Sequence, residues 1–276
     1  MRPAAAPAPT PVANARMYSA TPAAKQAWKV LLAWVLREAG LAWAVIDYDA
    51  PAPLAALWAR DDLGAAQMCG LPFSLRRPRP ALVAAPVPSP ARYAGRPVYF
   101  TDIVVRADDD ARGLEDTFGR IVGYTLEDSM SGCIALRRHL LPYRAGRDGP
   151  LFREAVGGLV NARRVIEALA ERRIDVGPLD SYFHDLLVAG DPAFAAQVRV
   201  LESTPGAPIP PLVATAALAP DEVQRLRDAF LRVGAAPALA PQREILLLAG
   251  FGLPESSDYD VFDGILADAA RFPGLW

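Results

Sequence analysis

The chain has 276 residues, 52% of them hydrophobic and 22% charged, enough for a sizeable core in one large or two small domains. Its formal net charge of -2 at pH 7, without a long run of Lys or Arg, excludes a basic surface for a nucleic acid backbone. Cys69 and Cys133 lack the spacing of a metal site. We expect two buried free thiols there, with one disulfide as the alternative, and neither a metal nor a cofactor.

The first stretch of the chain is rich in proline. Residues 1–13 predict a disordered lead-in, because prolines interrupt every apolar run. A secretory signal needs an uninterrupted apolar core of about 7–15 residues, and this stretch contains none. Nor is any window apolar and long enough to predict a membrane span.

Predicted strands and helices then alternate. Residues 15–20 predict a short strand, and residues 22–39 predict a helix with Pro22 in its first turn and Gly40 after its end. Next come a strand at 41–48, a helix at 53–62, and strands at 64–70, 81–87 and 97–107, the last long and continuous.

The second part of the chain continues the alternation, which favours mostly parallel sheets covered by helices on both faces. Strands are predicted at 120–125, 151–158, 174–180, 197–204 and 210–218. Helices are predicted at 131–143, 159–173, 219–233, 241–250 and 259–272.

Ligands of such sheets bind beyond the carboxyl ends of the strands. Four predicted loops lie at such positions, and they contain Tyr18-Ser19, Cys69-Gly70, residues 129–132 and residues 180–182. The third is the most informative, because Ser129, Ser131 and Gly132 stand together before a predicted helix. Two interpretations remain open for the serines: they cap the helix, or they hold an anion at its first turn.

Three stretches of this region resemble a known family. They read GYTLEDSMSGCIALRRHL, GGLVNARRVIEALAERRIDVGPLD and VLESTPGAPIPPLVATAAL. In this order they resemble the phosphonate-binding, PhnD-like solute-binding proteins of ABC transporters, and the resemblance covers roughly residues 14–272. It implies an α/β, two-lobed type II periplasmic-binding-protein fold, each lobe a mostly parallel sheet flanked by helices, with a ligand cleft between the lobes.

The resemblance also implies limits for the lobes. Lobe one would comprise residues 14–100 and 207–276, and lobe two residues 101–206. The chain would cross between them near residues 101–107 and again near residues 203–210.

The resemblance assigns roles to site residues. The loop with Ser129, Ser131 and Gly132 would grip phosphonate oxygens, and Asp180 would face the amine or hydroxyl end of the ligand. This sequence departs from the family twice: a histidine is missing near Asn161, which could replace it, and Cys69 replaces a tyrosine. The predicted ligand-binding set is Tyr18, Ser19, Cys69, Gly70, Ser129, Met130, Ser131, Gly132, Asn161, Asp180 and Tyr182.

The expected function is capture of a small oxyanion as the substrate-binding component of an ABC importer. Expected partners are the anion and a transporter permease, with no nucleic acid, and the protein would be a monomer or weak dimer. The resemblance implies a periplasmic location, whereas the missing signal leaves a cytoplasmic one open. The ligand could be a phosphonate, phosphite, phosphate ester or carboxylate.

Two alternatives to an importer component remain. The same fold hosts enzymes of the lyase or pyrimidine-precursor type, for which Asp180 and His184 form the candidate dyad, although His184 is expected at the surface. The second alternative is a cytoplasmic ligand sensor.

Overall fold

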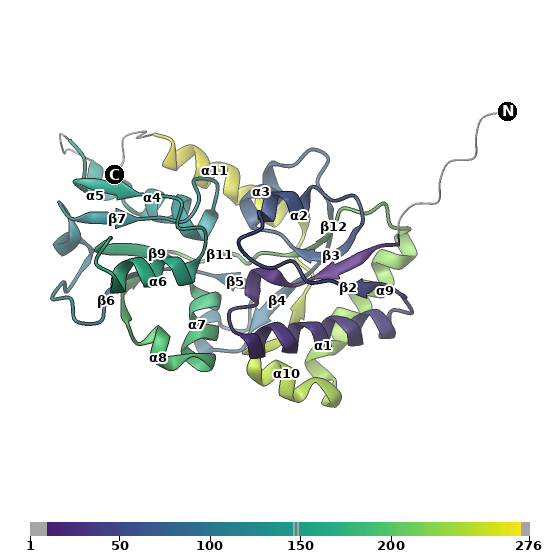
Figure 1. Cartoon of the computed structure of the whole chain (residues 1–276). Helices are drawn as coiled ribbons and strands as arrows, with labels where there is room; N and C mark the ends of the chain where they lie inside the picture. The colour runs from purple at the N-terminus through teal and green to yellow at the C-terminus, as the bar shows by residue number, and fades with distance from the viewer. Residues whose placement is uncertain (1–9, 146, 148, 272–276) are drawn as a thin grey trace.

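Two α/β lobes lie side by side and are joined at their centre (Figure 1). The computed structural model describes residues 10–145, 147 and 149–271. Of the disordered lead-in predicted for residues 1–13, residues 1–9 therefore lie outside the described residues. Among the described residues, no helix is both long and apolar enough to cross a membrane.

The first lobe contains a six-stranded sheet in the order β13-β4-β12-β3-β1-β2. β1 runs parallel to β2 and β3, whereas β12 runs antiparallel to both β3 and β4. The bounds are β1 Val12–Asn14, β2 Ala44–Val45, β3 Leu63–Gln67, β4 Ala81–Pro88, β12 Leu212–Ala214 and β13 Leu248–Gly252.

The second lobe contains a five-stranded sheet in the order β10-β6-β9-β7-β8. β7 is parallel to β8 and β9, while β6 is antiparallel to β9 and β10. The bounds are β6 Thr101–Arg106, β7 Ile121–Gly123, β8 Glu154–Val156, β9 Val176–Asp180 and β10 Val198–Ser203. The predicted fold class is confirmed, but both sheets are mixed rather than mostly parallel, because strands that follow a crossover run against their neighbours.

The two sheets are connected by a short crossover pair. β5 (Val98–Tyr99) and β11 (Ala207–Pro208) run antiparallel between the lobes (Figure 1). The strand predicted at 97–107 therefore divides at Phe100, and the segment expected to cross at 101–107 is instead β6 of the second sheet. The predicted return near 203–210 contains β11. We propose lobe limits close to those predicted, with the β5–β11 pair at the boundary.

Helices cover both faces of each sheet (Figure 1). In the first lobe, α1, α9 and α10 pack together on one face, and α2, α3 and α11 lie on the other. The bounds are α1 Pro22–Glu38, α2 Leu54–Trp58, α3 Gly70–Leu75, α4 Ala135–His139, α5 Leu141–Arg144, α6 Ala162–Ala170, α7 Ser181–Gly190, α8 Pro192–Ala195, α9 Pro220–Arg232, α10 Ala240–Ile245 and α11 Val261–Ala269. One face of α1 is apolar and buried, including Trp28, Leu31, Leu32 and Val35.

Several predicted elements are wrong in type or position. The first strand is β1, which begins inside the expected lead-in and ends one residue after it. Residues Arg16–Tyr18 of the predicted strand form a 3-10 turn instead. The helix predicted at 241–250 is helical only as far as Ile245, the end of α10. Leu247, with φ of 46°, then turns the chain into β13. β13 pairs with β4, so a long-range partner decides the conformation of this apolar run.

Candidate functional site

The loop after β7 begins with a side-chain cap. Ser129 Oγ accepts a hydrogen bond from the Gly132 N–H at 3.1 Å, so Ser129 caps the helical segment that follows. The first turn, Met130–Ile134, is a π-helical turn, in which the Ile134 N–H donates to Ser129 O at 3.0 Å. Such wide turns occur often at functional sites.

Gly132 is required by the packing of the loop itself. A Cβ at this position would collide with Thr125 Oγ1, and the Gly132 carbonyl accepts a hydrogen bond from the Thr125 N–H at 3.0 Å. The Gly132 N–H is already used by Ser129. The N–H therefore serves the loop itself, and the glycine allows close contact with Thr125.

Ser131 lies where the loop meets the crossover. Its carbonyl accepts a hydrogen bond from Thr101 Oγ1 at 3.2 Å. Its side chain faces the Tyr99 hydroxyl, which is buried and forms no hydrogen bond of normal length with any described residue. Burial, followed by the nearby Cys69 and Asp180, raises the pKa of Tyr99. A buried hydroxyl without a partner costs free energy, so an incompletely satisfied donor lies beside Ser131.

Asp180 ends β9 and caps α7. Its Oδ1 accepts the N–H groups of Tyr182 and Phe183 at 3.0 Å each. Its Oδ2 accepts the Tyr18 hydroxyl at 3.3 Å, which joins the two lobes. The Tyr182 ring lies 4.7 Å from that of Tyr18, but the Tyr182 hydroxyl donates to Leu246 O at 2.6 Å and is committed to the protein.

Asp180 is deep in the molecule, yet part of its surface stays accessible to water. Burial raises the pKa of its carboxyl to about 7, against the hydrogen bonds from Phe183 and Tyr18, which lower it. Burial also raises the pKa of the Cys69 thiol to about 11, so this thiol stays neutral at physiological pH. The cluster thus offers neutral donors and one acid that titrates near neutrality.

Cys69 belongs to the same cluster. It precedes α3 in lobe one, and its sulfur is approached by the backbone N–H of Met130 from the second lobe. Cys69 and Cys133 are both buried free thiols, as expected. Gly70 begins α3, where a Cβ would meet the Phe262 ring of α11.

Two residues of the predicted set bond elsewhere. The Ser19 hydroxyl donates to Ala15 O at 2.9 Å. Asn161 Oδ1 accepts the Arg164 N–H at 3.1 Å and caps α6. The structure thus brings together Tyr18, Cys69, Met130, Ser131 and Asp180, with Tyr182 packed behind them.

Sequence reasoning missed Tyr99 of the crossover and Thr101 at the start of β6, and it misplaced His184. Tyr99 and Thr101 both lie in the stretch 97–107, which predicts one continuous strand and gives no signal for a site. His184 is buried rather than exposed, and its Nδ1 lies 3.1 Å from Asp102 Oδ2, not beside Asp180. The dyad expected of an enzyme is therefore not formed.

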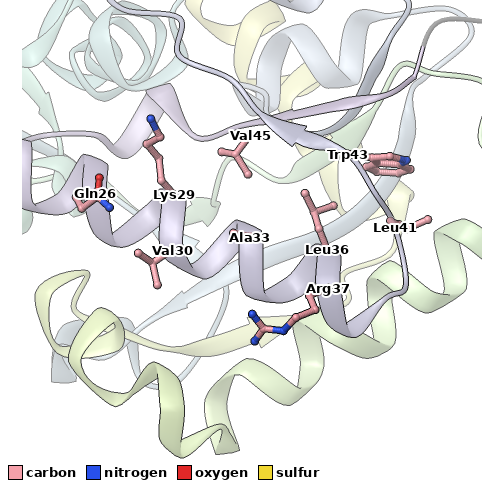
Figure 2. Close-up of a pocket in the computed structure, with 9 residues that line it drawn as sticks. All are labelled: Gln26, Lys29, Val30, Ala33, Leu36, Arg37, Leu41, Trp43 and Val45. Carbon is pink, nitrogen blue, oxygen red and sulfur yellow. The ribbon is translucent and has the colours of Figure 1, made fainter.

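One hollow lies away from this cluster, and another borders it. One, of about 560 Å³, is a groove between the outer face of α1 and the segment leading to β2; Figure 2 shows Val30 and Trp43 among its lining side chains. No residue of the predicted set lines it. The other, of about 450 Å³, borders the cluster at Tyr99, Thr101 and Met130 and extends between α4 and the end of β10.

Comparison with known proteins agrees with this architecture. A family model described as the periplasmic substrate-binding protein of an ABC phosphonate transporter matches residues 18–259. No curated protein sequence matches the chain significantly.

Similar solved structures support the fold. A binding-protein component of an ABC phosphonate transporter from Pseudomonas aeruginosa has a TM-score of 0.77 and 19% identity, covering 96% of this chain and 88% of that one. PhnD1 from Prochlorococcus marinus, in complex with methylphosphonate, has a TM-score of 0.76 and 14% identity, covering 96% and 98%. A Xanthomonas citri protein bound to ATP has a TM-score of 0.62 and 18% identity, with the same coverage.

Proposed function

Because this chain belongs to the family of periplasmic substrate-binding proteins of ABC phosphonate transporters, we propose that it captures a small phosphonate-like oxyanion between its lobes. It would then deliver the anion to the permease of an importer. The observation that carries the proposal is the meeting of Ser131, Tyr99 and Asp180 where the second lobe joins the crossover. Tyr18 and Cys69 complete this set from lobe one.

The chemistry of these side chains suits an oxyanion. The hydroxyls of Ser131 and Tyr99 donate without bringing charge, and the Cys69 thiol adds a weaker neutral donor. Asp180, with a pKa of about 7, can donate to an anion oxygen when protonated or accept from a ligand hydroxyl or amine when ionised. Hydrogen bonds to a charged group contribute roughly 1.5–3 kcal/mol each. Three or four of them, after ordering costs, support micromolar affinity, about 8 kcal/mol.

Calorimetry and thermal shift with a panel of anions test the proposal. Methylphosphonate is the first probe, followed by phosphite, phosphate and aminoethylphosphonate, with acetate as the control. We expect at least one phosphorus oxyanion to bind and to raise the unfolding free energy by about 2.7 kcal/mol at a hundredfold excess over Kd. If no phosphorus oxyanion binds more tightly than acetate, the proposed ligand class is wrong.

The enzyme alternative is not supported. The family consists of binding proteins rather than enzymes. His184 and Ser203 both contact Asp102, so neither forms the hydroxyl–imidazole pair that activates a nucleophile. We expect a bound phosphonate to be recovered unchanged, as phosphorus NMR of the mixture over hours would report.

A further inference from the structure

Arg92 lies where the chain leaves the first lobe. It belongs to a 3-10 turn, Ala91–Tyr93, that precedes β5. Its guanidinium pairs with two carboxylates of the second lobe: Nη1 lies 3.1 Å from Asp102 Oδ1 on β6, and Nη2 lies 2.8 Å from Asp185 Oδ1 on α7. Nη2 also donates to Ser181 O at 2.8 Å. One side chain therefore connects the start of the crossover to both β6 and α7.

The carboxylates that Arg92 bridges depend on it. The Asp102 side chain is fully buried, and its other partners are Ser203 Oγ at 2.6 Å and His184 Nδ1 at 3.1 Å. Asp185 accepts the Tyr93 hydroxyl at 2.6 Å. Without Arg92, the buried carboxylate of Asp102 and the half-buried carboxylate of Asp185 would lose the arginine they share, which strongly disfavours this arrangement.

The first turn of α7 transmits this restraint to the site. Ser181 exchanges two hydrogen bonds with Phe100 of the crossover: its N–H donates to Phe100 O at 3.0 Å, and its Oγ accepts the Phe100 N–H at 2.9 Å. The next two N–H groups, of Tyr182 and Phe183, donate to Asp180. The first turn of α7 therefore fixes the orientation of Asp180. Arg92 holds this turn through the Ser181 carbonyl and the Asp185 carboxylate.

We propose that Arg92 is a positioning residue for ligand binding: by bridging Asp102 and Asp185, it holds the first turn of α7 against the crossover and keeps Asp180 opposite Ser131. The role rests on the proposed function of Asp180, and Arg92 itself touches no ligand. Lysine cannot replace it, because an ammonium lacks the planar array of donors that reaches both carboxylates and the Ser181 carbonyl.

Arg92→Met is the test, and the chain contains a matched control. Arg120 also pairs with a buried carboxylate, with Nη1 3.0 Å from Asp109 Oδ1, and contacts a second acid, Asp110. The exposed fractions of the two arginine side chains are similar, 33% for Arg92 and 30% for Arg120. Their buried partners, Asp102 and Asp109, are 0% and 2% exposed. Arg120→Met should therefore remove an arginine of similar exposure from a buried carboxylate far from α7, although Asp109 keeps Arg106 at 3.5 Å.

Two measurements separate positioning from general stability. For methylphosphonate, we expect Arg92→Met to raise Kd at least tenfold and Arg120→Met to leave Kd within twofold of wild type. In ligand-free protein, the Tyr182 and Phe183 amides should exchange at least tenfold faster in Arg92→Met than in Arg120→Met, relative to amides of β4. If Arg92→Met and Arg120→Met have the same Kd and the same amide exchange rates, the proposal is overturned.

Further controls keep the proposal testable. If Arg92→Met does not fold, Arg92→Lys retains the charge and should still raise Kd severalfold and speed exchange at Tyr182; wild-type values for Arg92→Lys would overturn the proposal. If wild-type protein binds none of the phosphorus oxyanions, the proposed function fails. The exchange comparison, which needs no ligand, then decides alone whether Arg92 holds the α7 turn.

Discussion

Ser129 and Ser131 should respond oppositely to replacement by alanine. Ser129 Oγ accepts the Gly132 N–H, so Ser129→Ala removes a helix cap and should lower the free energy of unfolding by about 1 kcal/mol. The Ser131 side chain instead faces the Tyr99 hydroxyl, and the cap of this helical segment is Ser129 rather than Ser131. Ser131→Ala should therefore change stability by less than about 0.5 kcal/mol.

Affinity should show the reverse order. A lost hydrogen bond to a charged ligand costs about 1.5–3 kcal/mol, so Ser131→Ala should raise the Kd of the best-binding anion roughly 10- to 150-fold. Ser129→Ala should raise it by less than about threefold, because its hydroxyl is already bonded within the loop. Titration calorimetry and urea unfolding of both variants measure the two quantities. If Ser131→Ala loses stability and keeps its affinity, the loop is only a cap, and the reasoning is refuted.

Three further predictions concern neighbouring groups. The pKa of Asp180 is about 7 in the folded protein, above the value of about 4 for an Asp in the unfolded chain. Between these two pH values the folded state binds a proton that the unfolded state has lost. The contribution of Asp180 to stability therefore falls as pH rises from about 4 to 7. Asp180→Asn should remove this loss, which is roughly 1.4 kcal/mol per pH unit. Urea unfolding at several pH values measures it. If the unfolding free energies of wild type and variant change in parallel with pH, the argument is wrong. Tyr99→Phe should leave stability unchanged or raise it by up to about 1 kcal/mol while weakening anion binding, and a clear loss of thermal stability would contradict an unpaired hydroxyl. Gly132→Ala should cost about 1–3 kcal/mol through its clash with Thr125, and adding Thr125→Ala should recover part of this in denaturant titrations; no recovery would place the clash elsewhere.

Local patterns predicted the elements whose signals are complete within one stretch of chain. α1 has a proline at its start, a glycine after its end and an apolar face between them, and the structure matches this prediction. The run at 241–250 is apolar without a clear period, which is compatible with either helix or strand. Its second half becomes a strand only because β4 offers an edge to pair with.

The site was predictable to the extent that its residues stand at strand ends. Asp180 is the last residue of β9, and Ser131 lies in the first helical turn after β7, so their positions near the junction could be predicted from order alone. The direction of each side chain could not, because it depends on partners far along the chain. Tyr18 and Asp180 are 162 residues apart, and His184 meets Asp102 across 82 residues. Such contacts leave no periodic signal in the sequence.

The place of β12 in the first sheet dictates an order of assembly. β12 lies between β3 and β4 and pairs with both, although the whole second sheet separates these strands from it along the chain. During synthesis, the strands of the second sheet emerge before β12, so that sheet can form while the first still lacks a central strand. Long-range pairing of this kind is slow. We therefore expect the first lobe to complete its core last, by inserting β12 into a gap already framed by β3 and β4.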